Sequence, residues 1–506
     1  MKKSVFTAAA LAAVLALAGC SAAGQPDGGA AASGGTLTLG SGIDAASWDP
    51  ADAEFGNRIQ YMQPVYDSLL HINADLEIEP WLASKFEYND DSTVLTLTLR
   101  DDVTFSDGQV FDAAAAKANL EHFKTGTGQN SITLASVASI DVVGDHELTL
   151  TLSQADPALL RNLALVSGMQ ASPAVLDAGS LKTTPVGSGP YLLDADSTVT
   201  GSQYTFERNP DYWNTDFFPY DTIVIKPLSD LTARLNALKG GQIDAALADS
   251  KSMAEAKASG LDVNTMQGDW QGLFIVDRDG TKVPALGDER VRQAINYAID
   301  GDSILKAVRL GEGEPTTQIF NTTSQAYDPK LDDAYPFDPD KAGELLAEAG
   351  YEDGFSITMP EITGFNDLSV IVSQQLADVG ITVVPQTVAP DQTISALLSG
   401  EFPAFIFSWG SSNSWQDILK LVQPTAPWNM MKNEDPKLDA LITAAQQAQP
   451  EKATAAFQAV SEYLVDSAWF SPWYVQNNIY LSSPDTVVTM QPQNVVPYIW
   501  NFAPAK

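Results

Sequence analysis

Apolar and polar residues alternate strictly in several short stretches of the chain. Leu and Thr alternate over residues 94–99 and 148–152, and the same alternation over 36–39 marks where we expect ordered structure to begin. A period of two is typical of strands with one buried face. Residues 222–225 and 381–384 are more uniformly β-branched, which predicts strands that are more buried.

Other stretches have helical spacing. In residues 288–300 the apolar side chains recur at i, i+3, i+4, i+7 and i+8 from Val291, and Asp288 can cap the helix. Residues 338–350 combine an Asp-Pro start with a Gly stop, and a further helix is expected over 113–123. Interleaved strands and helices with no repeat of fixed period predict an α/β fold.

The N-terminus has the pattern of a secretory signal. A basic start, Met1 to Lys3, precedes an apolar stretch over 5–17 that is too short to span a bilayer. The stretch ends in LAGC, whose Cys20 is the only cysteine of the chain. This ending resembles the lipobox of bacterial lipoproteins and implies cleavage before Cys20, a lipid on its sulfur and an extracytoplasmic protein anchored to the cell membrane. The alternative is an ordinary signal with a chance cysteine.

Composition and charge narrow the function classes. The 506 residues are 44% hydrophobic and 18% charged, as in globular proteins, and leave room for about three domain-sized units. With 28 basic and 64 acidic residues the net charge is −36. Nucleic acid is therefore excluded as a partner, because a polyanion is repelled without a basic patch. Membrane contact is expected through the lipid alone.

No catalytic motif stands out. The three histidines, His71, His122 and His146, have no metal-binding spacing, and no nucleophile elbow, zinc motif or phosphate-binding loop is present. We therefore expect no enzyme activity, no cofactor and no metal. A surface-anchored hydrolase remains the alternative of another class, because 64 acidic residues contain many chance carboxylate pairs, and a sensor or adhesin is a third.

Seven ordered stretches carry a family resemblance. They resemble the extracellular solute-binding proteins of bacterial ABC importers, family 5, the peptide/nickel-type class. The stretches are PVYDSLL (64–70), EPWLASKFEYNDDSTVLTLTLRDDVTFSDGQVFDA (79–113), PVGSGPYLL (185–193), ERNPDYW (207–213), LNALKGGQIDAAL (235–247), DERVRQAINYAID (288–300) and PFDPDKAGELLAEAGY (336–351).

The resemblance implies a two-lobed α/β fold like that of the periplasmic binding proteins, of type II and of the large class with an extra subdomain in lobe I. Crossings between the lobes are expected near 282–284 and 483–485. The implied segments are a signal peptide (1–19), the lipidated Cys20 with a Gly/Ala/Ser-rich tether (20–35), lobe I (36–70), its extra subdomain (71–187), lobe I again (188–280), lobe II (281–484) and a return to lobe I (485–506).

Two stretches match ligand-contacting parts of the family. The first, AEFGN, supplies Glu54, Phe55, Gly56 and Asn57, and lends main chain to a peptide. The second, FIFSWGSSNSWQD, supplies Ser408, Trp409, Gly410, Ser411, Ser412, Asn413, Trp415 and Asp417, with Trp409 as the pocket tryptophan.

One position departs from the peptide-binding members. Ser412 stands where the family has an Asp that pairs with the α-amine of the peptide. A hydroxyl cannot replace that carboxylate, because losing one partner of a buried ion pair costs about 3–5 kcal/mol. Either Asp417 or Glu54 takes over the role, or the ligand has no free α-amine there.

The resemblance therefore implies a monomeric substrate-binding lipoprotein. It captures a small solute, a peptide or peptide-like molecule, between the lobes and delivers it to an ABC permease in the membrane. An oligosaccharide or another polar non-peptide ligand is the alternative, because the Ser, Asn and Trp side chains of residues 408–415 also suit such molecules.

Overall fold

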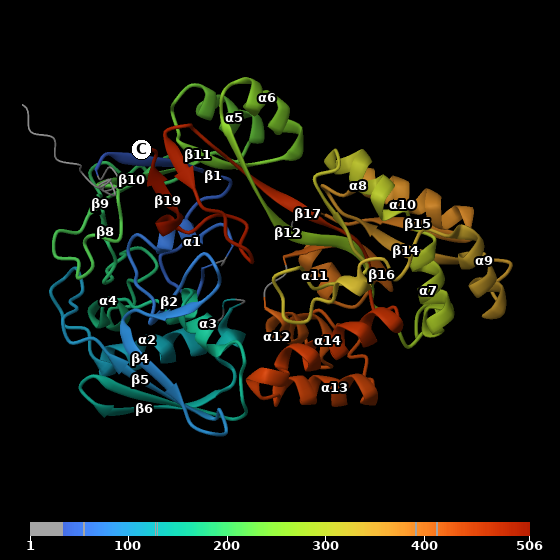
Figure 1. Ribbon diagram of the computed structural model, residues 1–506, viewed down its shortest axis with the longest axis horizontal. Helices are drawn as coiled ribbons and strands as arrows, with labels where there is room; N and C mark the ends of the chain where they lie inside the picture. The colour runs from blue at the N-terminus through green and yellow to red at the C-terminus, as the bar shows by residue number, and fades with distance from the viewer. Residues whose placement is uncertain (1–33, 54–55, 127, 129, 390–391, 411–412) are drawn as a thin grey trace, which may run out of the picture.

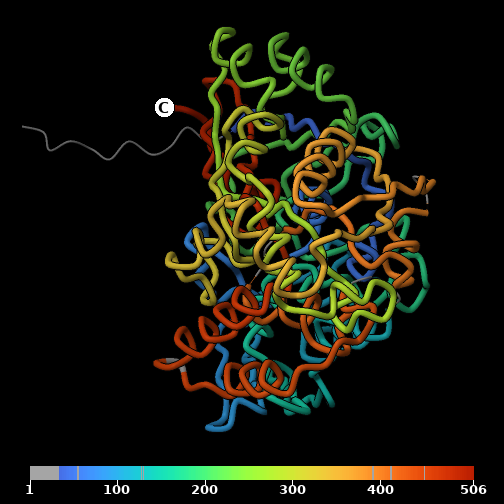
Figure 2. Tube along the Cα trace, turned by 90° about the vertical axis from the view of Figure 1, so that its right-hand side faces the viewer, coloured from blue at the N-terminus to red at the C-terminus, as the bar shows by residue number. Residues whose placement is uncertain are grey.

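Two long strands, β12 (Asp262–Ile275) and β17 (Ser471–Ser482), run side by side between the two halves of the molecule (Figure 1). The computed structural model describes residues 34–53, 56–126, 128, 130–389, 392–410 and 413–506. We call the half with the N-terminal strands lobe I and the half with the helices after β12 lobe II. Figure 2 looks from the side of lobe II, and both views place the C-terminus with lobe I.

One large sheet passes through both lobes. Its order is β16-β12-β17-β11-β1-β10-β9-β8, and β13 also pairs with β17. The first part of β12 runs toward lobe I, and residues 269–275 pair with β16 in lobe II. The other members are β1 (Thr36–Ser41), β8 (Tyr191–Leu193), β9 (Tyr204–Arg208), β10 (Thr222–Pro227), β11 (Ala245–Ala248), β13 (Gly313–Pro315) and β16 (Ala404–Gly410).

Smaller sheets complete the lobes. An antiparallel sheet in lobe I has the order β4-β5-β7-β6, and three two-stranded sheets pair β2 with β3, β14 with β15, and β18 with β19. Their bounds are β2 (Leu70–Ile72), β3 (Ile78–Pro80), β4 (Ala83–Tyr88), β5 (Val94–Leu99), β6 (Val137–Gly144), β7 (Glu147–Leu152), β14 (Phe355–Glu361), β15 (Ile381–Thr387), β18 (Thr486–Val488) and β19 (Phe502–Pro504).

Helices cover the sheets of both lobes. Lobe I contains α1 (Ile59–Met62), α2 (Ala113–Thr125), α3 (Leu159–Leu163), α4 (Pro173–Asp177), α5 (Leu231–Lys239) and α6 (Met253–Ala258). Lobe II contains α7 (Glu289–Tyr297), α8 (Gly301–Arg309), α9 (Pro339–Glu348), α10 (Asn366–Asp378), α11 (Thr393–Leu398), α12 (Ser414–Asp417), α13 (Pro436–Gln446) and α14 (Pro450–Asp466).

The predicted local elements agree well with these bounds. The alternating stretches are β1, β5 and β7, and the predicted strand over 222–225 is part of β10. The carboxylates of Asp112, Asp288 and Asp338 accept backbone N–H bonds at the starts of α2, α7 and α9, as N-caps do. Gly350 after α9 has a φ of +82°, the left-handed conformation expected of a helix stop.

The prediction for residues 381–384 was wrong in one respect. They form β15, but this strand pairs only with β14, in a two-stranded sheet, rather than lying buried in a larger one. Only Ile381 of β15 is buried, and Val384 is 44% exposed. β-branched residues favour strands, but their pattern does not reveal whether a sheet continues on both sides.

Alternation along β12 divides the core of lobe II into two clusters. Trp270 and Phe274 face the cluster under α12 to α14, whereas Leu273 and Ile275 face the cluster under α7 to α10. Successive side chains of a strand point to opposite faces, so one strand fills both cores. The predicted lobe boundaries at 280–281 and 484–485 stay predictions; β12 and β17 already pass through both lobes before these positions.

Candidate functional site

The two lobes touch through α3 of lobe I and α12 of lobe II, which face each other in Figure 1. The amide of Gln416 donates a hydrogen bond to the side-chain oxygen of Asn162 across the junction. Gln446 Nε2 donates to the carbonyl of Ala155 at 3.0 Å. Ala158, in the turn before α3, is buried in the core cluster of lobe II. These contacts hold the two lobes together, so residues of both lobes lie side by side at the junction.

Trp409 lies near the end of β16, beside this junction. It pairs in register with Trp270, and its half-buried indole packs edge-on against Trp428 with ring centroids 5.3 Å apart. Trp409 Nε1 donates to Asp417 Oδ1 at 3.3 Å. Trp409 is thus fixed from two sides and keeps part of its aromatic surface exposed, as a residue that contacts a solute must.

Charged groups from both lobes interact with Asp417. The carboxylate is 1% exposed and interacts electrostatically with Arg161 of α3 and with Lys420, which follows α12. Burial lowers the pKa of Arg161, and Asp417 acts in the opposite direction. Burial likewise lowers the pKa of Lys420, whereas Asp417 raises it and Arg161 lowers it further. One anion and two cations that act on one another electrostatically therefore lie near the contact of the lobes.

Ser408 and Gly410 face the other side of β16. Ser408 Oγ donates to Asp269 Oδ2 at 3.1 Å, and Gly410 pairs in register with Asp269. Burial raises the pKa of Asp269, while the bond from Ser408 and the charge of Arg309 lower it. A bulge between Gln267 and Trp270 places this carboxylate where β12 passes from one lobe to the other.

The remaining predicted site residues have varied places. Gly56 and Asn57 are half-buried in the turn before α1. Asn413 caps α12, since its side-chain oxygen accepts from Gln416 N at 2.9 Å, and Trp415 is 2% exposed in the core of lobe II. Their roles in binding stay predictions. The positions of Cys20, Glu54, Phe55, Ser411 and Ser412 lie outside the described residues.

Several polar residues at the junction were not predicted from the sequence. They are Asn162, Arg161, Asp269, Gln416 and Lys420. The only local signal is in α3, where an Arg-Asn pair interrupts an apolar helix, LLRNL. A polar pair on a short buried helix needs partners, but the sequence does not say that they come from the other lobe.

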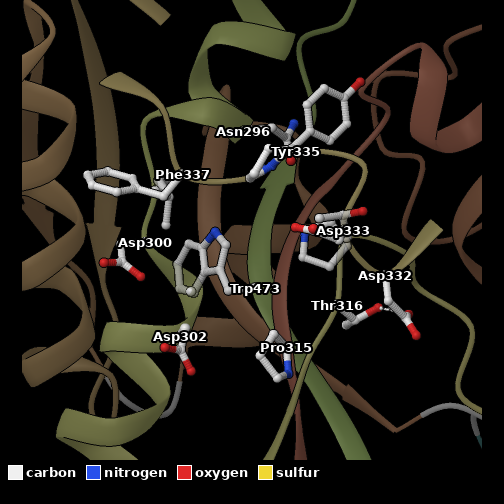
Figure 3. Close-up of a pocket in the computed structure, with 15 residues that line it drawn as sticks. Asn296, Asp300, Asp302, Pro315, Thr316, Asp332, Asp333, Tyr335, Phe337 and Trp473 are labelled. Carbon is white, nitrogen blue, oxygen red and sulfur yellow. Dashed lines mark hydrogen bonds between the residues drawn. The ribbon is translucent and has the colours of Figure 1, made fainter. Parts of the chain in front are cut away.

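A separate hollow of about 170 Å³ lies within lobe II (Figure 3). Trp473 occupies the middle of the view, with Asp300 and Asp302 on one side and Asp332 and Thr316 on the other. Asp300 caps α8 and Asp332 accepts bonds from Thr316 and Gln318, so these carboxylates already serve the fold. None of the predicted site residues lines this hollow.

The described part of the chain has neither a metal-binding cluster nor a membrane-spanning helix. Within it, no group of three or more His, Cys, Asp and Glu side chains is arranged to hold a metal ion. Over the same residues, no helix is both long and apolar enough to cross a membrane.

Residues 77–420 match the sequence model of a family described as bacterial extracellular solute-binding proteins, family 5. The glutathione-binding protein GsiB of Salmonella paratyphi A is 29% identical over 355 residues, and its counterpart from Escherichia coli K12 is 28% identical over 353 residues. Each alignment covers 67% of this chain and 67% of the relative.

Solved structures show the same fold. DppA of Helicobacter pylori with the peptide STSA has a TM-score of 0.79 at 21% identity, covering 94% of this chain and 99% of that one. HbpA2 of Haemophilus parasuis has a TM-score of 0.81 at 23% identity, covering 93% and 100%. NikA of Brucella suis with Fe(III)-EDTA has 0.79 at 24% identity, also covering 93% and 100%. The predicted fold class is confirmed.

Proposed function

The chain belongs to the bacterial extracellular solute-binding proteins of family 5, and we propose that it captures a peptide or peptide-like solute between its two lobes. The family match over 77–420, which spans the lobe junction, is the observation that carries this proposal. The chain is a substrate-binding protein of an ABC importer, which binds a small solute and delivers it to the permease. Its relatives are solute-binding proteins and not enzymes, so the hydrolase alternative is set aside.

The relatives favour a peptide-like solute. Curated relatives at 28–29% identity bind glutathione, itself a peptide, and one structural neighbour holds a tetrapeptide. Trp409 and Asp417 at the junction fit such a ligand, because an aromatic face can cover apolar side chains while a carboxylate orients a polar end. Asp417 is our candidate to replace the carboxylate that Ser412 lacks.

A polar non-peptide solute is the second candidate. The neighbours include AgaA of A. tumefaciens with agropinic acid and NikZ of Campylobacter jejuni with Ni(L-His). The same two-lobed fold thus serves chemically different ligands, and an oligosaccharide also fits the Ser, Asn and Trp side chains near Trp409.

Titration calorimetry of the mature chain tests the proposal. Glutathione, the tetrapeptide Ser-Thr-Ser-Ala, maltotriose and the nickel–histidine complex are suitable probes. We expect one of the two peptides to bind more tightly than maltotriose and the nickel complex, and to raise the thermal midpoint by mass action. Preference for maltotriose or the nickel complex would assign the second candidate. No binding, with no solute found by native mass spectrometry of the purified protein, would reject both.

We also propose that a lipid on Cys20 anchors the protein outside the cytoplasm. The order of basic start, short apolar stretch and LAGC supports it. Mass spectrometry of the protein extracted from membranes should find an acylated N-terminal Cys20. The variant Cys20→Ala should be released from the membrane fraction. A wild-type chain that carries no acyl group would contradict the anchor.

A further inference from the structure

The hollow of lobe II in Figure 3 has room for an organic group. Its volume of about 170 Å³ is slightly larger than that of a cavity of about 150 Å³ that can hold benzene. Its walls come from the start of α8, from β13 and the residues after it, from residues 332–337 and from β17. None of the residues predicted to bind the solute lines it, so a ligand here would occupy a second site.

The lining of the hollow is acidic. Four aspartates contribute to it, and none of the lining residues that the structure describes is basic. Asp300 and Asp302 lie at the start of α8, where their charges offset the positive end of the helix. Asp302 also forms an ion pair with Lys306, which lies one turn further along α8. These two carboxylates are therefore largely balanced by the protein itself.

The other two carboxylates, Asp332 and Asp333, have no such cation. Asp332 accepts hydrogen bonds from neutral groups, which are the hydroxyls of Thr316 and Tyr327 and the amide of Gln318. Asp333 is exposed and makes no hydrogen bond or ion pair with any residue that the structure describes. Their negative charges are therefore available to a cation in the hollow.

The side-chain donors around the hollow are already used. Protein oxygens accept hydrogen bonds from the side chains of Asn296, Thr316, Thr317, Tyr335 and Trp473. A ligand that brings only acceptors would therefore find no free side-chain donor among the described residues of the lining. Anionic groups are excluded for the same reason and by the acidic charge.

Asn296 provides a buried acceptor that lacks a donor. The residue is 5% exposed, and its Nδ2 donates to the carbonyls of Arg292 and Phe470 at 3.0 and 3.3 Å. Its side-chain oxygen accepts from no residue of the described chain. Unlike the fully enclosed atoms that lack a partner, this oxygen keeps accessible surface, and Asn296 lines the hollow. Buried polar atoms are rarely left unpaired, so a donor from a ligand would complete this site.

An organic cation meets these requirements. An ammonium group has three N–H donors and a guanidinium has five, and neither has an acceptor. Pro315 and Trp473 add apolar surface against which a hydrocarbon stem can pack. A bare metal ion fits less well, because no group of three or more His, Cys, Asp and Glu side chains in the described ranges is arranged to hold one.

We propose that the hollow of lobe II binds the guanidinium or primary ammonium group of an organic cation, at a second site outside the lobe junction. Asp332 and Asp333 balance its charge and accept its N–H groups, and the side-chain oxygen of Asn296 accepts another. The inference goes beyond the capture of a solute between the lobes and does not depend on which solute is captured.

Two probes of nearly equal shape separate charge from size. Butylguanidinium is a cation, and butylurea is its neutral counterpart. Calorimetry uses the mature wild-type chain in about 0.15 M salt, which screens the general attraction of a protein with a net charge of −36. We expect butylguanidinium to bind at least about tenfold more tightly than butylurea, the usual worth of a hydrogen bond to a charged group.

A third probe assigns the source of the cation. Acetyl-arginine methylamide carries the same guanidinium on a peptide backbone. Binding of this probe as well as butylguanidinium supports a site that accepts a basic side chain of another protein. Binding of butylguanidinium alone supports a site for free cations.

Variants then locate the binding. Asp333→Asn should weaken the binding of butylguanidinium by about threefold, the range for a partly exposed charge pair. Asp333→Lys places an ammonium beside the hollow and should weaken it by at least about tenfold. Asp353→Lys, on an exposed carboxylate of lobe II outside the hollow, changes the net charge equally and should bind as the wild type does. Thermal midpoints within about 2 °C of the wild type show that the variants are folded.

A crystal soaked with butylguanidinium gives an independent readout. Its planar group should lie within hydrogen-bond distance of Asn296 Oδ1. The inference is overturned by equal affinity for the two butyl probes, by no binding of either up to about 20 mM, or by equal losses in Asp333→Lys and Asp353→Lys. Butylguanidinium found only at the lobe junction would overturn it too. None of these results bears on the proposed function, which is tested with peptide probes.

Discussion

The carboxylate of Asp67 accepts a hydrogen bond from the hydroxyl of Tyr212, 145 residues later in the chain, at 2.8 Å. Trp81 Nε1 donates to the same oxygen at 2.8 Å, and Trp213 Nε1 donates to the other at 3.2 Å. These residues come from PVYDSLL, EPWLAS and ERNPDYW, three of the stretches that carried the family resemblance. Three of the stretches that carried the resemblance therefore meet in one contact within lobe I.

Removing the Asp67 carboxylate should destabilise lobe I. In Asp67→Ala, the buried hydroxyl of Tyr212 and the half-buried indoles of Trp81 and Trp213 lose their acceptor. Each orphaned donor costs about 1–3 kcal/mol. Urea denaturation should show a loss of about 3 kcal/mol or more. Asp75→Ala, on an exposed carboxylate of the same lobe, should change stability by less than about 0.5 kcal/mol. Equal stabilities of the two variants would mean that the contact contributes nothing.

Asp67 and His71 make the folding stability depend on pH in opposite directions. Burial raises the pKa of Asp67 to about 6, whereas bonds from Trp81, Tyr212 and Trp213 lower it. Folding therefore takes up a proton at Asp67 between about pH 4 and 6, and stability falls as pH rises through that window. Burial lowers the pKa of His71 to about 4, so between about pH 4 and 6.5 stability rises with pH.

Because the two windows overlap, the contributions cancel in the wild type, and single variants should reveal them. In Asp67→Asn only the His71 contribution remains, so the free energy of unfolding should rise by about 3 kcal/mol as pH increases from 4 to 6.5. In His71→Phe only the Asp67 contribution remains, so the free energy of unfolding should fall by about 3 kcal/mol as pH increases from 4 to 6. Urea denaturation at several pH values measures both slopes. Parallel curves for the three proteins would refute the opposed titrations.

Trp409 should matter for binding. Trp409→Ala removes the aromatic surface beside Asp417 and should weaken the binding of the preferred peptide probe by at least about tenfold. Trp409→Phe keeps a ring but loses the indole N–H, so an intermediate loss is expected. Phe337→Leu, on a half-exposed ring that lines the separate hollow of lobe II, should leave calorimetric affinity unchanged. Unaltered affinity in Trp409→Ala would remove this residue from the site.

The bond between Gln416 and Asn162 should bias the molecule toward the closed state. Gln416→Ala and Asn162→Ala should each enlarge the radius of gyration measured by X-ray scattering without solute, and should each weaken solute binding. The double variant should lose less than the sum of the single losses, with a coupling of about 1 kcal/mol. Gln374→Ala, on an exposed glutamine of α10, serves as the control. Strictly additive losses would show that the two side chains act separately.

Two glycines should respond oppositely to alanine. A Cβ on Gly189 would lie 2.4 Å from the carbonyl carbon of Val65, so Gly189→Ala must displace backbone and should cost about 1–3 kcal/mol. Gly343 lies within α9 with open space around the same position, so Gly343→Ala should gain about 0.5–1 kcal/mol from helix propensity. Thermal unfolding would contradict this reading if Gly189→Ala were the more stable of the two.

Local elements could be predicted because their causes are local. The Leu/Thr alternation of β5 and the Asp338 cap of α9 follow from side-chain geometry within a few residues. The exposure of β15 could not, because it depends on which strands the fold brings alongside. The same limit applied to the site. Trp409 could be proposed from a motif, whereas Lys420 carries no local signal.

Periodicity and ordered motifs were enough to predict the α/β elements, their caps and the family. The meeting of α3 of one lobe with α12 of the other, and the interaction of Arg161, Asp417 and Lys420 there, became known from the folded chain alone. The physical reason is that charge interactions act through space and depend on burial. Residues such as Asn162 and Gln416 are 254 positions apart in the chain. They become neighbours only after β12 and β17 have paired and the two lobes have come into contact.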